Sequence, residues 1–195
     1  MMRKLLLLFA LILVSCGKPG LPAPAHATDV SWRYQQAADF LLVDTSGKPR
    51  RLSDFRDKAV VVIFGYTHCP EICPATLAGL AQVMRVLGAE AAGVQVIFVT
   101  LDPERDTPDV LGKFVPSFSP SFLGLYGDAQ ATAQAAKTFG VNYEKHFDKN
   151  GGYTLDHSDW TYLIGGNGRV IWLSPYQQRT DYLAEDIKLL LKTVH

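Results

Sequence analysis

Two cysteines, Cys69 and Cys73, lie four residues apart near the middle of the chain, and they are the only cysteines after residue 16. An apolar run from Val60 to Phe64 precedes them and is typical of a buried strand. Pro74 follows and is expected at the first position of a helix, a place that suits proline. Because a helix N-terminus favours negative charge, it favours thiolate over thiol. The pair is therefore expected to bind a metal or to exchange disulfides.

A histidine distant in the sequence, His157, is the candidate third member of this site. It stands just before the apolar stretch from Trp160 to Ile164. Two thiolates and one imidazole suit copper or zinc, whereas calcium and magnesium prefer oxygen ligands. Structural zinc sites normally have four ligands, and only three are indicated here, so the set fits copper better.

Strands and helices alternate after residue 38 and must position these side chains. Apolar patterns predict strands over residues 40–43, 60–64, 94–101, 122–126, 160–164 and 170–173, and helices over 74–87, 108–115, 129–139 and from 180 onward. A weaker alternation over 141–146 predicts an edge strand, and residues 156–158 are expected to form a loop. This order predicts an α/β domain with a thioredoxin-like fold, a central mixed sheet flanked by helices. In that architecture the loop before Trp160 approaches the cysteine loop.

Deep burial is expected for six apolar side chains of the predicted strands and first helix: Val61, Ile63, Leu80, Val96, Ile97 and Leu163.

The N-terminus predicts export and lipidation. Two basic residues precede ten apolar residues, a run too short to span a bilayer comfortably, and the run ends in a Leu-Val-Ser-Cys16 sequence that resembles a bacterial lipobox. Residues 1–15 are thus expected to be a lipoprotein signal peptide, with a lipid on Cys16. An uncleaved membrane anchor is the alternative.

The domain organisation follows from this reading. Residues 16–37 contain three prolines among small residues and are expected to be the lipid anchor and a flexible tether. Residues 38–195 remain as the folded domain, on the extracytoplasmic (periplasmic) side of the bacterial cell envelope, where disulfides can form. The chain has 19 basic and 19 acidic residues, which gives no reason to expect nucleic acid as a partner.

The stretch Gly65-Tyr66-Thr67-His68-Cys69-Pro70-Glu71-Ile72-Cys73-Pro74 resembles the signature of the Sco/SenC family of copper-binding assembly proteins. The resemblance extends over residues 38–195 and includes Leu101-Asp102-Pro103-Glu104-Arg105-Asp106-Thr107-Pro108. It implies that Cys69, Cys73 and His157 bind one copper ion, Cu(I) or Cu(II). It also implies a metallochaperone that helps to mature the dinuclear copper centre of cytochrome c oxidase. The expected partners are the copper-site subunit of that oxidase and other copper chaperones.

Other interpretations stay open at this point. The cysteine pair could serve a thiol–disulfide oxidoreductase, a peroxiredoxin-type peroxidase or a structural disulfide. His68 and His146 are candidate fourth ligands, and Asp156 is a candidate to orient His157 by a hydrogen bond. The acidic residues between Asp102 and Asp106 are expected to be a capped turn at the edge of the site.

Overall fold

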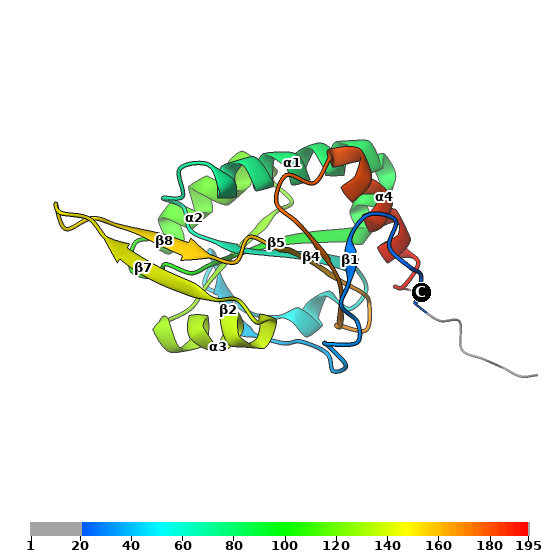
Figure 1. The fold of residues 1–195 in the computed structure, drawn as a ribbon, viewed down its shortest axis with the longest axis horizontal. Coiled ribbons are helices and arrows are strands. Elements are labelled where there is room, and N and C mark those ends of the chain that lie inside the picture. The colour runs from blue at the N-terminus through cyan, green and yellow to red at the C-terminus, as the bar shows by residue number, and fades with distance from the viewer. Residues whose placement is uncertain (1–20, 195) are drawn as a thin grey trace, which may run out of the picture.

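The central sheet has eight strands in the order β1-β10-β9-β4-β5-β6-β2-β3 (Figure 1). The structure is a computed structural model that describes residues 21–194. The strands are β1 Thr28–Asp29, β2 Leu41–Asp44, β3 Pro49–Arg51, β4 Ala59–Gly65, β5 Val94–Thr100, β6 Leu123–Tyr126, β9 Thr161–Ile164 and β10 Val170–Ser174. Parallel and antiparallel pairs both occur, so the predicted central mixed sheet of a thioredoxin-like fold is confirmed. The residues expected to form a signal peptide, and Cys16, lie outside the described residues.

Helices cover both faces of this sheet (Figure 1). They are α1 Ile72–Leu87, α2 Pro108–Phe114, α3 Ala129–Phe139 and α4 Thr180–Leu191, with 3-10 turns at Leu52–Phe55, Gly88–Gly93 and Val115–Ser117. Apolar side chains of α1, α2 and α4 pack into one core cluster, and those of α3 pack into a second cluster on the opposite face. The sheet thus lies between two hydrophobic layers.

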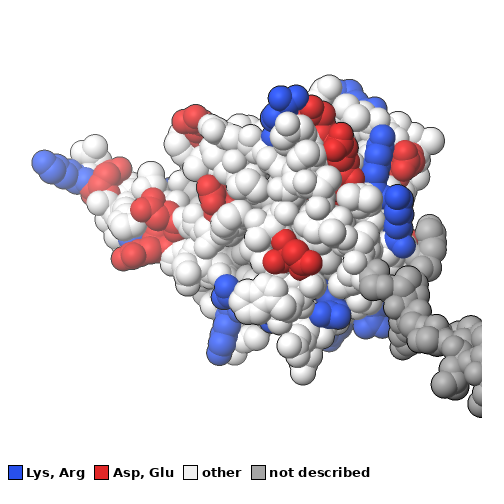
Figure 2. Space-filling model, turned by 45° about the vertical axis from the view of Figure 1, so that its right-hand side comes forward, with Lys and Arg blue, Asp and Glu red and all other residues white. Residues whose placement is uncertain are grey.

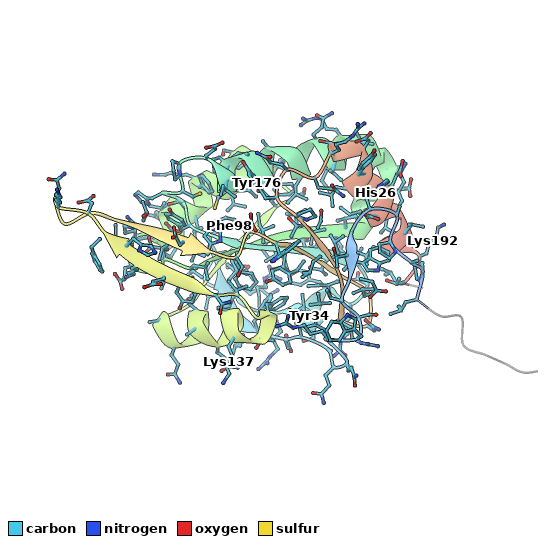
Figure 3. The ribbon with its side chains drawn as sticks, in the orientation of Figure 1. His26, Tyr34, Phe98, Lys137, Tyr176 and Lys192 are labelled. Carbon is cyan, nitrogen blue, oxygen red and sulfur yellow. The ribbon has the colours of Figure 1, made fainter. Side chains whose placement is uncertain are left out.

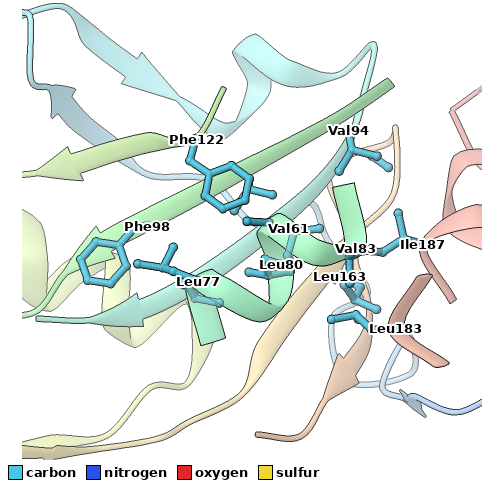
Figure 4. Packing of buried hydrophobic residues seen from close by; sticks show 14 of the residues in the cluster. Val61, Leu77, Leu80, Val83, Val94, Phe98, Phe122, Leu163, Leu183 and Ile187 are labelled. Atoms are coloured by element: carbon cyan, nitrogen blue, oxygen red, sulfur yellow. The ribbon is translucent and has the colours of Figure 1, made fainter. Parts of the chain in front are cut away.

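Strand β4 lies at the centre and leads directly to the cysteines. It pairs in parallel with β5 and antiparallel with β9, and all seven of its residues are buried. A strand covered on both faces needs the continuous apolar run that its sequence has. Figure 4 shows Leu77, Leu80 and Val83 of α1 packed over the sheet. The six side chains predicted to be buried are all at most 4% exposed.

Helix α1 begins at Ile72, two residues before the predicted start. Cys73 therefore lies in its first turn, and Pro74 occupies the third helical position rather than the first. Proline fits there because the first four N–H groups of a helix have no partner within it. Among the described residues, Ile72–Gly93 is the one helical stretch long and apolar enough to cross a membrane. Here it packs against the sheet and α4 as a core helix.

The edge strand predicted over residues 141–146 forms over residues 143–147, but it does not belong to the central sheet. Strand β7, Tyr143–Phe147, pairs only with β8, Tyr153–His157, in a separate two-stranded sheet. This hairpin projects from the body of the domain (Figure 1) and carries charged side chains of both signs (Figure 2). Asp148 closes its turn by accepting bonds from backbone N–H groups, and Gly151 there has φ +82°, which favours glycine. His157 consequently ends a strand instead of lying in a loop.

Residues 25–30, expected to belong to the tether, are packed against the domain. The buried carboxylate of Asp186 in α4 accepts hydrogen bonds of 2.7–3.0 Å from three successive backbone N–H groups, those of Ala25, His26 and Ala27. The His26 ring, labelled in Figure 3, stacks on Tyr182 at 3.7 Å. Strand β1 then pairs with β10. Ordered structure therefore begins well before residue 38.

Candidate metal centre

The three sequence-predicted ligands lie together. One ligand atom from each of Cys69, Cys73 and His157 falls within 4.8 Å of the other two. The sulfur of Cys73 is 3.8 Å from Nε2 of His157, although 84 residues separate them in sequence. Cys73 is 4% exposed, whereas Cys69 is partly exposed, and both are free thiols. The site therefore has one deeply buried cysteine and one less buried cysteine beside one imidazole.

The end of β4 makes room for the buried sulfur. Gly65 is the last residue of that strand, and a Cβ placed on it would lie 2.6 Å from Sγ of Cys73 and 3.1 Å from the ring of Phe98. Real Cβ atoms essentially never come this close to another atom. Glycine at this position is therefore required by the packing of the site, and its sequence position next to the cysteine loop did not reveal that requirement.

The orientation of His157 leaves one ring nitrogen free for a metal. Its Nδ1 lies 2.9 Å from the carbonyl oxygen of Ser158. Because a carbonyl oxygen only accepts hydrogen bonds, Nδ1 carries a proton, and Nε2 is the ring nitrogen that faces Cys73 and can bind a metal. The Tyr66 ring meets this imidazole edge-on, with ring centroids 6.1 Å apart. A backbone carbonyl, rather than the predicted Asp156, thus fixes the tautomer.

The two thiols differ in acidity. The pKa of Cys69 is lowered to about 5, chiefly because the Cys73 thiol donates a hydrogen bond to its sulfur. Burial opposes this shift, and backbone N–H groups at the start of α1 add to it. The same hydrogen bond, together with burial, raises the pKa of Cys73 well above its ordinary range. At neutral pH the metal-free site therefore holds a thiolate at Cys69 and a thiol at Cys73.

A hollow of about 560 Å³ gives access to this thiolate. It lies between the cysteine loop and β8, and its lining includes Tyr66, Cys69, Ile72, Leu155 and His157. A ligand or a partner's side chain entering the hollow would meet the accessible sulfur before the buried one.

The other candidate ligands point elsewhere. The ring of His68 lies 3.7 Å from the carboxylate of Asp106. His146 pairs with Asp156 at 3.1 Å, so the Asp156 carboxylate is directed to His146 and not to His157. Among the described residues the metal-type cluster contains neither histidine. In the structure, therefore, Asp156 does not pair with His157, and neither histidine joins the cluster of the three ligands.

The turn between Asp102 and Asp106 is more deeply involved than expected. Both carboxylates are at most 1% exposed, and both form hydrogen bonds toward the segments that carry the ligands. From the sequence, these residues are expected only to form a capped turn at the edge of the site. One signal could have located them: β4 and β5 are parallel neighbours whose ends, Gly65 and Thr100, are in register, so the loops that follow both strands meet at one edge.

Comparison with known proteins identifies the family. A model of the SCO1/SenC family matches residues 29–192, most of the chain. This chain belongs to the SCO1/SenC family. The match begins inside β1, before the domain boundary expected at residue 38.

Curated Sco relatives extend over a similar range. The mitochondrial SCO2 homolog of Mus musculus is 35% identical over 185 residues, covering 88% of this chain and 72% of the mouse protein. The Bos taurus homolog is 43% identical over 133 residues, covering 67% of this chain and 50% of the bovine protein, so this match spans half of that relative's length. A SCO2-like protein of Rickettsia felis is 32% identical over 162 residues, covering 82% of this chain and 79% of the Rickettsia protein.

Solved Sco structures share the fold. ScoI of Bradyrhizobium japonicum with copper bound is 35% identical, with a TM-score of 0.72 over 80% of this chain and 99% of that chain. Apo Sco1 of Thermus thermophilus is 41% identical, with a TM-score of 0.73 over 80% of this chain and 91% of that chain. Yeast Sco1 with copper bound is 27% identical, with a TM-score of 0.73 over 81% of this chain and 89% of that chain.

Proposed function

We propose that this Sco protein binds one copper ion through Cys69, Cys73 and His157, and that it helps to mature the dinuclear copper centre of cytochrome c oxidase. The observation that carries the proposal is the cluster itself: two sulfurs and one imidazole nitrogen converge within 4.8 Å. Soft thiolate donors and imidazole are the ligands that copper selects. Copper in the Bradyrhizobium japonicum and yeast Sco structures supports the choice of metal.

The side chains of this site would bind copper and then transfer it to the target. Cys69 offers a ready thiolate at the hollow, and Cys73 must lose its proton for both sulfurs to bind. His157 adds a nitrogen donor, which Cu(II) needs more than Cu(I) does. A site with three protein ligands leaves room for a ligand from the target, so copper can pass by exchange of ligands.

A second function, thiol–disulfide exchange, is favoured by the difference between the cysteines. An accessible thiolate beside a buried thiol is the arrangement of an attacking and a resolving cysteine. Cys69 would attack a disulfide of the target's copper site and release one target thiolate. Cys73 would then lose its proton and attack Cys69, which releases the second target thiolate and forms the Cys69–Cys73 disulfide. Two electrons pass to the target, and the protein would then act as an oxidoreductase.

The proposed place of action is the extracytoplasmic face of the bacterial cell envelope. The lipid on Cys16 would hold the domain at a membrane, next to the copper-site subunit of the oxidase and other copper chaperones. Bacterial relatives, such as the Rickettsia felis protein, support a bacterial setting for a chain of this family.

Copper titration of the reduced chain, followed by thiolate-to-copper charge-transfer absorption, tests the proposal. We expect one copper ion per reduced chain and essentially none per oxidised chain, because a disulfide offers neither thiolate. Replacing His157 by Ala should weaken Cu(II) binding strongly and Cu(I) binding less. His146→Ala is the matched control, since it removes a histidine of the same hairpin that lies outside the cluster.

Oxidase assembly in cells separates the two functions. If His157→Ala and Cys69→Ser both abolish assembly, copper carriage accounts for the activity, and this is the result we expect. If His157→Ala supports assembly as the parent does while Cys69→Ser does not, thiol exchange is the function.

A further inference from the structure

The loop from Thr100 to Thr107 supplies no ligand, yet it contacts both halves of the metal centre. It follows β5 and contains two carboxylates, Asp102 and Asp106, whose exposures are 0% and 1%. Buried carboxylates are stable only when their oxygens accept hydrogen bonds or meet a positive charge. The partners that satisfy them here come from two segments distant in sequence, the cysteine loop and the β7–β8 hairpin.

Asp106 holds the cysteine loop. Its two oxygens accept hydrogen bonds from the backbone N–H of Thr67 at 2.9 Å and from the Thr67 hydroxyl at 2.6 Å. The Thr100 hydroxyl, from the end of β5, donates to the same carboxylate at 2.6 Å. Thr67 stands two residues before Cys69, so these bonds fix the point from which the loop turns toward its first sulfur.

Asp102 holds the strand that ends in His157. It accepts a hydrogen bond of 2.6 Å from the Tyr153 hydroxyl, at the start of β8, and it pairs with Arg105. Arg105 in turn donates to the Tyr153 carbonyl oxygen at 2.9 Å and lies over the Tyr153 ring, 3.6 Å from its centroid. Side chain and backbone of Tyr153 are thus both anchored to the loop, four residues before the histidine.

We propose that Asp102 and Asp106 are positioning residues that set the distance between the histidine and the two sulfurs before any metal arrives. The hairpin packs in its own two-stranded sheet and projects from the domain, so the main sheet's hydrogen-bond ladder does not hold it. The contacts of Asp102 and Arg105 supply that restraint. The inference rests on the proposed function, in that it takes Cys69, Cys73 and His157 to be the copper ligands.

Tyr153→Phe tests the hairpin side in the full chain. It removes the hydroxyl that bonds Asp102 and keeps the ring over Arg105. Tyr143→Phe is the matched control, because Tyr143 lies on the same hairpin and its hydroxyl has no hydrogen bond among the described residues. We expect amide exchange in β7 and β8 of the metal-free protein to quicken about tenfold in Tyr153→Phe. Cu(II) affinity should fall roughly tenfold or more, as when a metal ligand's support is lost, while Cu(I) affinity changes little.

Thr67→Val tests the cysteine side. It removes the hydroxyl bonded to Asp106 and keeps the backbone N–H bond. The Cys69 amide, which donates to the Tyr66 carbonyl, should exchange about tenfold faster while the hairpin amides exchange as in the parent. Because the Cys69 thiolate is a ligand in both oxidation states, Cu(I) and Cu(II) affinities should fall together.

The two variants together decide the inference. The inference is supported if amide exchange quickens in the hairpin of Tyr153→Phe and at Cys69 of Thr67→Val, each without the other. It is overturned if Tyr153→Phe matches Tyr143→Phe in both exchange and Cu(II) affinity. It is equally overturned if both variants quicken exchange throughout the domain, which would mean a general loss of stability. If the parent binds no copper, the proposed function fails, and the exchange measurements still test the loop because they use metal-free protein.

Discussion

Gly65 and Cys73 share one small volume at the end of the central strand: a Cβ on the glycine would lie 2.6 Å from the cysteine sulfur. The same added Cβ would lie 3.1 Å from the ring of Phe98, and Gly65 and Cys73 are brought together where β4 gives way to α1. The position of the buried ligand is therefore set by a residue that has no side chain.

Replacing Gly65 by Ala should displace this sulfur. We expect a loss of about 1–3 kcal/mol in the free energy of unfolding, typical of inserting an atom into a packed core, and weaker copper binding. Urea denaturation and copper titration measure the two effects. Gly79→Ala is the control: Gly79 lies in α1 with nothing within 4 Å of an added Cβ, so alanine there should stabilise the helix by about 0.5–1 kcal/mol. Equal responses of the two variants would contradict the assignment.

The lowered pKa of Cys69 predicts its reactivity. Since that pKa is about 5, the thiolate is present above pH 5 and disappears as the pH falls below it. Alkylation of Cys69 by iodoacetamide in reduced, metal-free protein should rise through a midpoint near pH 5 and change little from pH 6.5 to 8. The Cys73 thiol, whose pKa is raised, should stay unmodified over this range. Mass spectrometry of the alkylated peptides assigns each site.

A Cys73→Ala variant checks the cause of this reactivity. It removes the thiol that hydrogen-bonds to Cys69, the largest of the contributions that lower the Cys69 pKa. The alkylation midpoint should then move up toward the ordinary range of a thiol. An unchanged midpoint would show that the backbone N–H groups of α1 suffice on their own.

How far the sequence predicts this site depends on how local each feature is. The cysteine pair at the junction of a buried strand and a helix was predictable, because the apolar run and the cysteine spacing are adjacent in sequence. The approach of His157 was predictable only through the expected fold. Strand β8 was missed because Asp156 and His157 read as loop residues, although Tyr153 and Leu155 alternate as a strand requires. The bond from Thr67 to Asp106 joins residues 39 apart and depends on the pairing of strands, which no local pattern contains.

Asp186→Asn should loosen the N-terminal segment. The carboxylate accepts three backbone hydrogen bonds within a buried site, and the amide can accept at only one of its two polar atoms. We expect a loss of about 1–3 kcal/mol in unfolding free energy and faster amide exchange at residues 25–27. Glu185→Gln is the control, because Glu185 is exposed and its pairing with His26 contributes at most about 1 kcal/mol. If exchange at residues 25–27 stays as in the parent, this carboxylate does not hold the segment.

Cys16→Ser tests the proposed lipid anchor. The change removes the sulfur that would carry the lipid, so we expect the unprocessed precursor, with residues 1–15 still attached, to accumulate. Intact-mass spectrometry of membrane fractions distinguishes precursor from mature protein. A mature parent protein whose Cys16 carries no lipid would contradict the proposal.

The attachment of residues 25–30 to α4 and β10 would limit how far a lipid-anchored domain can move from its membrane. If Cys16 carries the proposed lipid, the eight residues 17–24 link it to Ala25, and the nine Cα–Cα steps of that fully extended chain cover about 30 Å. Strand β1 and α4 lie at one end of the long axis, and the β7–β8 hairpin that carries His157 points to the other (Figure 1). The domain would then search for its target in two dimensions, within a thin layer over the bilayer and at a raised local concentration.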